Sequence, residues 1–216
     1  MNSVISWSGG KDSALAFYKA LQETRISLLF TMFSPEGYTM SHRIPRRILE
    51  KQAEDIGVAM AGRSAVWMTY EDEFRKALIS LREQGVENCI FGDIDLEEHI
   101  DWGRRICKEV GIQAKHPLYG MDESQVLREF IEAGFQAQIV VVKLDRLGTE
   151  YLGRTLDTVL IQEFTRQGIS PAGEFGEYHT LVTGGPIFKG HSLKNELDRK
   201  QPRVLFNQGY AFWDLE

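Results

Sequence analysis

A short polar segment near the start of the chain combines the residue types that bind phosphate. It is rich in glycine, contains one lysine and is flanked by hydroxyl groups; its members are Ser8, Gly9, Gly10, Lys11, Asp12 and Ser13. Glycines let the backbone approach an anion closely, and the N-terminus of a following helix offers unpaired N–H groups and the positive end of a dipole. The segment therefore predicts a phosphate cradle; the alternative is a glycine-rich turn capped by serine and aspartate.

Two common phosphate-binding loops do not fit this segment. The GxxxxGK[ST] loop needs a glycine where the chain has Ile5, and a serine or threonine where it has Asp12. The GxGxxG fingerprint also fails, because Gly9 and Gly10 are adjacent and are followed by Lys11. Asp12 has two interpretations of equal weight: it could help to place Mg²⁺ beside a phosphate group, or it could stabilise the first turn of a helix.

A second polar cluster lies far down the chain, in the segment GEFGEYHT over residues 173–180. It holds Glu174, Glu177, His179 and Thr180. In an extended segment Glu177 and His179 share a face, so the pair could orient a nucleophile, transfer protons or bind a cationic group. On these residues alone, a polar turn leading into a strand is the favoured alternative.

Two further candidate positions follow predicted strands. Gly92 and Asp93 end an apolar run, where backbone can meet a nucleotide and where Asp93 could face a ribose, a metal or an acceptor; capping of the next helix is the alternative. His42 and Arg43 lie in the loop after the second strand and could bind phosphate or a carboxylate. A solvated loop is the alternative there.

The elements that must position these residues alternate apolar runs with amphipathic stretches. Strands are predicted over 3–7, 26–33, 65–69 and 88–92, and helices over 13–23, 45–56, 74–81 and 100–110. This order predicts an α/β protein, with a Rossmann-like parallel sheet and helices on both faces. Ligands bind at the carboxyl ends of the strands in such a sheet.

The pattern changes after Pro117. Helices are predicted over 123–133 and 150–166, and strands over 138–143, 179–183, 187–189, 204–206 and 208–214. We therefore expect two domains: a nucleotide-binding domain over residues 1–120 and a smaller C-terminal α+β domain over residues 121–216.

Composition narrows the class of protein. The 216 residues include 25 Lys+Arg and 31 Asp+Glu, and the net charge of −6 argues against binding nucleic acid through bulk charge. Cys89 and Cys107 are too few for a disulfide framework, and their apolar surroundings argue against a role in carrying sulfur. Because the sequence shows neither a signal-peptide pattern nor a long apolar run, we expect a cytoplasmic protein without a membrane span.

The SGGKDS loop, directly after the first strand, resembles the loop of the PP-loop ATP pyrophosphatases, within the adenine nucleotide alpha hydrolase-like superfamily. The resemblance implies that the loop holds the β and γ phosphates of ATP. The α phosphorus is then open to an oxygen nucleophile, and the products are AMP and pyrophosphate.

The GEFGEYHT segment resembles the hallmark of one branch of that group, the diphthine–ammonia ligase family. Further matches are spread over nearly the whole chain, at Ser41–Pro45, Gln52–Glu54, Phe91–Ile94, His99, Trp102, Pro117–Tyr119, Leu144–Asp145, Leu147–Gly148, Val182 and Gly185–Phe188. There is one departure: Ala172 stands where family members often carry cysteine.

The resemblance implies an ATP-dependent, amide-forming ligase. An acceptor carboxylate would be adenylated and ammonia would displace AMP; in the family the acceptor is diphthine, a modified histidine on translation elongation factor two. The implied catalytic residues are Lys11, Glu174, Glu177 and His179. The nucleotide would be bound by 8–13 with Gly92 and Asp93, the substrate by His42, Arg43, Glu174, Glu177, His179 and Thr180, and Mg²⁺ by Asp12.

Two alternatives stay open. One is a PP-loop ATP pyrophosphatase that acts on another acceptor, either a small molecule or tRNA. The other is a nucleotide-binding regulator without turnover. The expected partners are ATP, ammonia and a carboxylate acceptor, with a second copy of the chain as a further candidate.

Overall fold

The computed structural model describes residues 2–190, 193, 197 and 203–216. In the first half, strands and helices alternate in the order β1 (Asn2–Ser6), α1 (Lys11–Ala20), β2 (Arg25–Phe33), α2 (Arg46–Ile56), β3 (Ala59–Ser64), η1 (Trp67–Thr69), α3 (Tyr70–Glu83), β4 (Asn88–Ile90), α4 (Glu97–Val110) and β5 (Gln113–Lys115). The second half contains α5 (Glu123–Glu132), β6 (Gln136–Lys143), η2 (Thr149–Tyr151), α6 (Thr158–Gln167), β7 (Tyr178–Gly184), β8 (Val204–Asn207) and β9 (Tyr210–Trp213).

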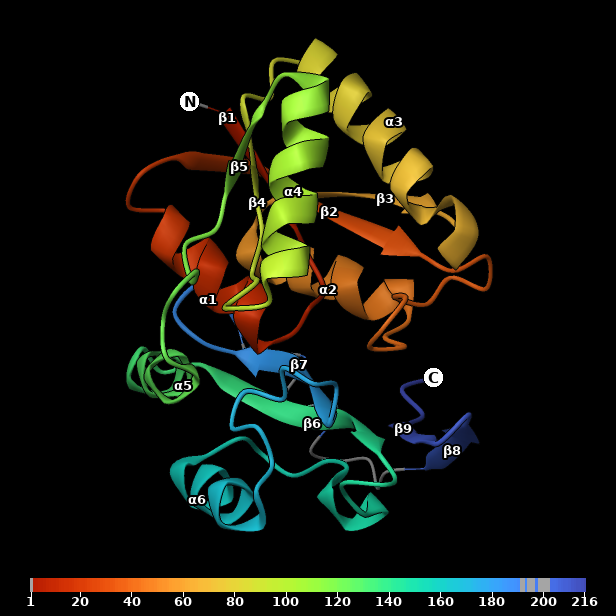
Figure 1. The fold of residues 1–216 in the computed structure, drawn as a ribbon, viewed down its shortest axis with the longest axis vertical. Coiled ribbons are helices and arrows are strands. Elements are labelled where there is room, and N and C mark those ends of the chain that lie inside the picture. Colours follow the sequence, from red (N-terminus) through yellow and green to blue (C-terminus); the bar gives the residue numbers. More distant parts are fainter. Residues whose placement is uncertain (1, 191–192, 194–196, 198–202) are drawn as a thin grey trace.

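The first half forms a five-stranded parallel sheet in the order β3-β2-β1-β4-β5. Successive residues of β1 point to opposite faces, as strand geometry requires: Val4 packs in the core cluster that contains residues of α3 and α4, and Ile5 in the one that contains residues of α1 and α2. Helices therefore cover both faces of the sheet (Figure 1). The predicted Rossmann-like α/β fold is confirmed.

A second, antiparallel sheet has the order β7-β6-β9-β8. It lies with α5 next to the end of the parallel sheet from which α1 begins, and α6 lies on its far side (Figure 1). Phe17 of α1, Phe130 of α5 and Val140 of β6 belong to one buried apolar cluster, so the two halves share a core. The sheets thus match the predicted division of architecture, while the domain limits 1–120 and 121–216 stay a prediction.

The strand predicted over 65–69 is wrong. The third strand is Ala59–Ser64, and Trp67–Thr69 form a turn of 3-10 helix. The reason is that β3 is an edge strand with no fully buried residue, which leaves it without an apolar signal. Ala65 is buried, but the larger apolar residues that mimicked a strand are on the surface, where Trp67 is 66% and Met68 96% exposed.

Two predictions in the second half are also wrong in detail. The helix predicted over 150–166 is split, because Asp157 accepts a hydrogen bond from the Leu160 N–H and starts α6 there. The strand predicted over 187–189 is a turn, in which the Phe188 N–H donates to the Gly185 carbonyl. The short strand β5 carries no signal that would have predicted it.

Within the described part of the chain, no helix combines the length and apolar character that a membrane crossing requires. Both cysteines lie in the core cluster that contains residues of α3 and α4. Burial raises the pKa of the Cys89 thiol well above its usual range, which keeps it in the protonated form.

Candidate active site

A cleft of about 530 Å³ opens between the carboxyl ends of the parallel strands and the segment leading into β7. Most of the residues predicted to form a site line it: Ser8, Lys11, Asp12, Ser13, His42, Gly92, Asp93, Glu174, His179 and Thr180. The remaining predicted residues, Gly9, Gly10, Arg43 and Glu177, are not part of its lining. The tertiary fold therefore joins the two sequence motifs in one cavity.

The loop between β1 and α1 requires its two glycines. Gly9 has φ +80°, and a β-carbon there would lie 2.5 Å from Leu49 Cδ2 and 2.9 Å from Gln52 Oε1. A β-carbon on Gly10 would lie 2.9 Å from His42 Nε2. The loop can pack this closely because it has no side chains at these positions, and the N-terminus of α1 faces the cleft.

Lys11 and Asp12 form an ion pair in the first turn of α1, with 2.8 Å between Nζ and Oδ2. Lys11 is buried, and its backbone N–H donates to Thr180 Oγ1 at 3.1 Å. Burial raises the pKa of Asp12, an effect that Lys11 opposes. The lysine charge is thus held at the helix N-terminus, where a phosphate would be attracted.

Asp12 also has a free acceptor. Its Oδ1 is buried and has no hydrogen-bond partner among the described residues. Across the described chain, no group of three or more His, Cys, Asp or Glu side chains is arranged to hold a metal ion. Mg²⁺ is usually held by one or two carboxylates together with substrate phosphates, so Asp12 fits this ion as a single protein ligand completed by a nucleotide.

Strand β7 is bonded directly to the loop between β1 and α1, which is the predicted phosphate loop. The Val182 N–H donates to the Gly9 carbonyl at 2.9 Å. Gln52 of α2 reinforces this contact: its Nε2 donates to the Val182 carbonyl at 2.7 Å and to the Gly9 carbonyl at 3.2 Å, and its Oε1 accepts from Trp7 Nε1 at 2.9 Å. One buried side chain therefore joins β1, the loop and β7.

Gln52 was not among the predicted site residues. The available signal was a polar residue on the apolar stripe of a helix, because its neighbours on that face are Ile48, Leu49, Ala53 and Ile56. Gln52 is only 1% exposed. A polar side chain in such a place must find buried hydrogen-bond partners, and here these belong to the loop.

The end of β4 packs against the first turn of α1. A β-carbon on Gly92 would lie 2.9 Å from both the carbonyl carbon of Asp12 and the nitrogen of Ser13. The Asp93 carboxylate faces two imidazoles, with 3.5 Å to His99 Nδ1 and 3.7 Å to His116 Nδ1. Asp93 raises the pKa of His99, whereas burial lowers that of His116.

The two glutamates of the second motif have different surroundings. Glu174 lines the cleft, and burial followed by the nearby charge of Asp12 raises its pKa to about 8. Glu177 is 3% exposed, and its carboxylate accepts from the backbone N–H groups of Ser170 and Phe175. Glu177 therefore holds the loop that presents Glu174.

Two histidines from opposite halves of the chain meet in the cleft. The ring centroids of His42 and His179 are 4.4 Å apart. Burial, with His179 second, lowers the pKa of His42 well below its usual value; burial, with Lys11 second, lowers the pKa of His179 to about 4. Both imidazoles are therefore neutral at pH 7, so each can accept one hydrogen bond and donate another.

An aromatic wall lines the cleft on the side of α3 and α4; it consists of Trp67, Tyr70, Phe91 and Trp102. The Trp67 and Tyr70 rings stack at 5.7 Å between centroids. Burial raises the pKa of Tyr70 to about 12, so its hydroxyl stays protonated. The wall is an apolar surface of aromatic rings, and its stacked pair, Trp67 and Tyr70, is suited to a planar group.

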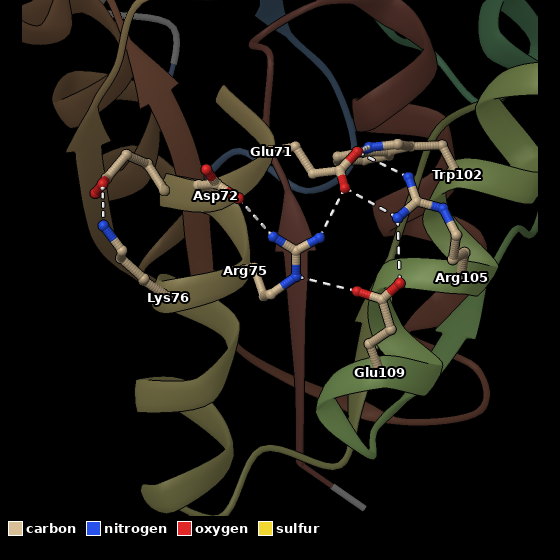
Figure 2. A network of polar contacts seen from close by, with 8 residues as sticks. Glu71, Asp72, Arg75, Lys76, Trp102, Arg105 and Glu109 are labelled. Carbon is tan, nitrogen blue, oxygen red and sulfur yellow. Dashed lines mark hydrogen bonds and ion pairs between the residues drawn. The ribbon is translucent and has the colours of Figure 1, made fainter. Parts of the chain in front are cut away.

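A charged network of α3 and α4 holds one residue of this wall, Trp102 (Figure 2). Trp102 Nε1 donates to Glu71 Oε2 at 2.9 Å. Glu71 also accepts from Arg105 and Arg75, and both arginines bind Glu109. Hydrogen bonding by Arg105, the largest cause, lowers the pKa of Glu71 to about 2. The network ties α3 to α4 and orients the Trp102 indole.

Each half of the chain matches the model of a known protein family. Residues 1–114 match the sequence model of the diphthamide synthase N-terminal domain, and residues 122–210 match that of the diphthamide synthase C-terminal domain. Among solved structures, the chain is similar to a predicted subunit of tRNA methyltransferase from Methanocaldococcus jannaschii (TM-score 0.47, 17% identity, covering 86% of this chain and 98% of that one). It is also similar to the U34-tRNA thiolase NcsA from Methanococcus maripaludis (TM-score 0.42, 12% identity, 97% and 76%).

Two curated relatives are diphthine–ammonia ligases. The human protein is 34% identical over 90 residues, which cover 39% of this chain and 33% of the relative. The mouse protein is 26% identical over 125 residues, covering 55% of this chain and 46% of the relative. The chain thus matches less than half the length of either relative. Because the two domain matches together span almost all of the sequence, the chain belongs to the diphthamide synthase family.

Proposed function

We propose that the chain is an ATP-dependent ligase that converts an acceptor carboxylate into an amide, as a diphthine–ammonia ligase does. One observation carries the proposal: the phosphate loop and the Glu174–His179 segment, far apart in sequence, line a single cleft. The family match and the names of the curated relatives support it. The side of the cleft formed by the phosphate loop is suited to the nucleotide. The side formed by the Glu174–His179 segment is suited to the acceptor and ammonia.

In the first step the loop binds the β and γ phosphates of ATP at the N-terminus of α1. Lys11 leaves its pairing with Asp12 and neutralises the pyrophosphate. An oxygen of the acceptor carboxylate attacks the α phosphorus, the bond from this phosphorus to the bridging oxygen breaks, and pyrophosphate leaves. Positive charge placed where negative charge develops is expected to contribute most to catalysis of this step.

Asp12, with its unpaired Oδ1, would hold Mg²⁺ together with the phosphates. Bound there, the ion supplies charge neutralisation of the leaving group. Gly92 and Asp93 lie beside the same turn, and we assign them to the nucleotide. Ser8 and Ser13, whose hydroxyls are 3.1 Å apart, are assigned to the phosphates.

In the second step the nitrogen of ammonia attacks the carbonyl carbon of the acyl adenylate. The carbon–oxygen bond to AMP breaks, and the surplus proton passes to the Glu174 carboxylate. With a pKa of about 8, Glu174 is mostly protonated at pH 7, and its ionised fraction, which grows as pH rises towards 8, accepts this proton. The neutral imidazoles of His42 and His179 orient the acceptor, while Glu177 and Thr180 support the loop and α1.

The acceptor is proposed from the family to be diphthine on translation elongation factor two. The cytoplasmic location of the protein and its association with a second copy of the chain stay predictions. A direct test incubates the protein with ATP, Mg²⁺, an ammonium salt and elongation factor two that carries diphthine. Pyrophosphate release and the mass of the modified peptide are the measurements.

We expect pyrophosphate and amide in equal amounts, both dependent on the acceptor. ATP binding without pyrophosphate release would contradict the proposal and favour a regulator. Pyrophosphate release that depends on tRNA, and not on the factor, would replace the acceptor while keeping the nucleotide chemistry.

A further inference from the structure

A second hollow, of about 610 Å³, adjoins the active-site cleft. The two cavities have four residues in common: Met40, Ser41, Trp67 and His179. The second is walled by the loops that follow β2 and β3 and by residues of β8 and β9 and the turn between them. A molecule in it can therefore reach the cleft at this shared seam without crossing the phosphate loop.

Neighbouring residues of one loop serve the two cavities. His42 lines the cleft, whereas Arg43 lines the second hollow. Arg43 has φ +50°, a left-handed conformation that residues with a side chain rarely adopt. Such an outlier points to a functional demand on the backbone.

The Arg43 guanidinium is held by aromatic rings. Its Cζ lies 5.2 Å from the ring centroid of Tyr38 and 5.3 Å from that of Phe212. It forms no ion pair with any residue that the structure describes, although Glu36 lies at the rim of the same hollow. Cation–π contacts use the faces of a guanidinium, so its N–H groups remain available to an anion in the plane.

We propose that this hollow is the acceptor subsite and that it takes a carboxylate on a short apolar arm, with Arg43 as the charge partner. The inference rests on the proposed function, because the seam leads to the cleft where the α phosphorus would lie. The carboxylate pairs with the Arg43 fork beside Ser41 and His179, and the arm lies along Trp67 and Tyr210. Arg43 is thus assigned to capture of the acceptor and not to the nucleotide.

The test uses butyrate, a carboxylate on a short apolar arm, and butyramide, its uncharged analogue. Binding is measured by calorimetry on protein saturated with α,β-methylene-ATP and on protein without nucleotide. We expect wild type to prefer butyrate by about tenfold or more, since a charge-assisted pair contributes at least this much. In Arg43→Met that preference disappears, and in Arg43→Lys, which keeps the charge but not the fork, part of it returns.

Arg46→Met is the matched control, because the Arg46 guanidinium also lies over a ring, that of Phe33 at 4.2 Å, and does not line the hollow. Arg43→Asn guards against misfolding, since asparagine tolerates left-handed backbone. Equal binding of butyrate and butyramide by wild type, or unchanged preference in the Arg43 variants, would overturn the subsite. Loss of α,β-methylene-ATP binding by wild type would instead contradict the proposed function, and the butyrate titration without nucleotide still decides the subsite.

Discussion

Replacing Gln52 with methionine tests whether one side chain joins the two halves of the site. The substitution Gln52→Met keeps a long, unbranched side chain in the buried position, so changes in packing are small. It removes the acceptor for Trp7 Nε1 and the donor to the carbonyls of Val182 and Gly9. The change therefore isolates the polar contacts of Gln52.

The magnitude follows from the groups left without a partner. The Gly9 carbonyl keeps the hydrogen bond from the Val182 N–H, so only the Trp7 N–H and the Val182 carbonyl lose their partners. An unsatisfied buried group costs about 1–3 kcal/mol, so the free energy of unfolding should fall by roughly 2–6 kcal/mol. Because domains have about 5–15 kcal/mol of stability, most of this range leaves the protein folded.

Equilibrium unfolding in urea, followed by tryptophan fluorescence and by circular dichroism, measures the change. Glu50→Met, on the exposed face of the same helix, is the control and should stay within about 0.5 kcal/mol of wild type. Calorimetry with α,β-methylene-ATP then reports the loop, and binding should weaken in Gln52→Met but not in the control. A loss below about 1 kcal/mol, or nucleotide binding equal to that of wild type, would refute the argument that Gln52 sets the loop.

Three further changes probe the site. Lys11→Met removes the charge at the N-terminus of α1 and should weaken α,β-methylene-ATP binding by about tenfold or more in calorimetry. The control variant, Lys76→Met at an exposed position, should bind the nucleotide as wild type does. Equal binding by the two variants would rule out the placement of the phosphates. Folding raises the pKa of Glu174 from 4.5 to about 8, so the folded protein holds an extra proton between these pH values, and this residue makes the free energy of unfolding fall as pH rises through that window. Glu174→Gln should therefore flatten the fall in urea midpoints measured from about pH 5 to pH 8. An unchanged slope would contradict the pKa shift. Thr180→Val removes the acceptor of the Lys11 N–H and should lower the free energy of unfolding by about 1–2 kcal/mol, whereas Thr180→Ser should keep it; equal stability of the two variants would show that the contact is unimportant.

The parallel sheet and its helices could be predicted because burial leaves a periodic pattern. The helices with strong apolar stripes were placed within a few residues, as for α4, where Ile100, Ile106 and Val110 face the core. The edge strand Ala59–Ser64 could not be, because half of its surroundings are solvent and its sequence has no apolar alternation. The periodic pattern of apolar residues in a sequence reflects which side chains are buried. An edge strand buries few side chains, so its sequence shows little of this pattern.

The sequence by itself predicted the phosphate loop, since only the order of residues between β1 and α1 is needed to specify backbone that can approach an anion; phosphate binding there stays a prediction. It also determined the α/β class and marked GEFGEYHT as a polar cluster. It could not determine how that cluster divides. The backbone turns at Gly173 and Gly176, with φ +71° and +75°, direct Glu174 into the cleft and leave Glu177 bonded to backbone N–H groups.

Only the tertiary structure decided which partners meet. It placed β7 against the loop, brought the ring of His42 beside that of His179 and bonded Gln52 of α2 to the Val182 carbonyl of β7. The physical reason is that these contacts join residues more than a hundred positions apart. Each depends on the packing of two sheets around one core, and no local spacing encodes that packing.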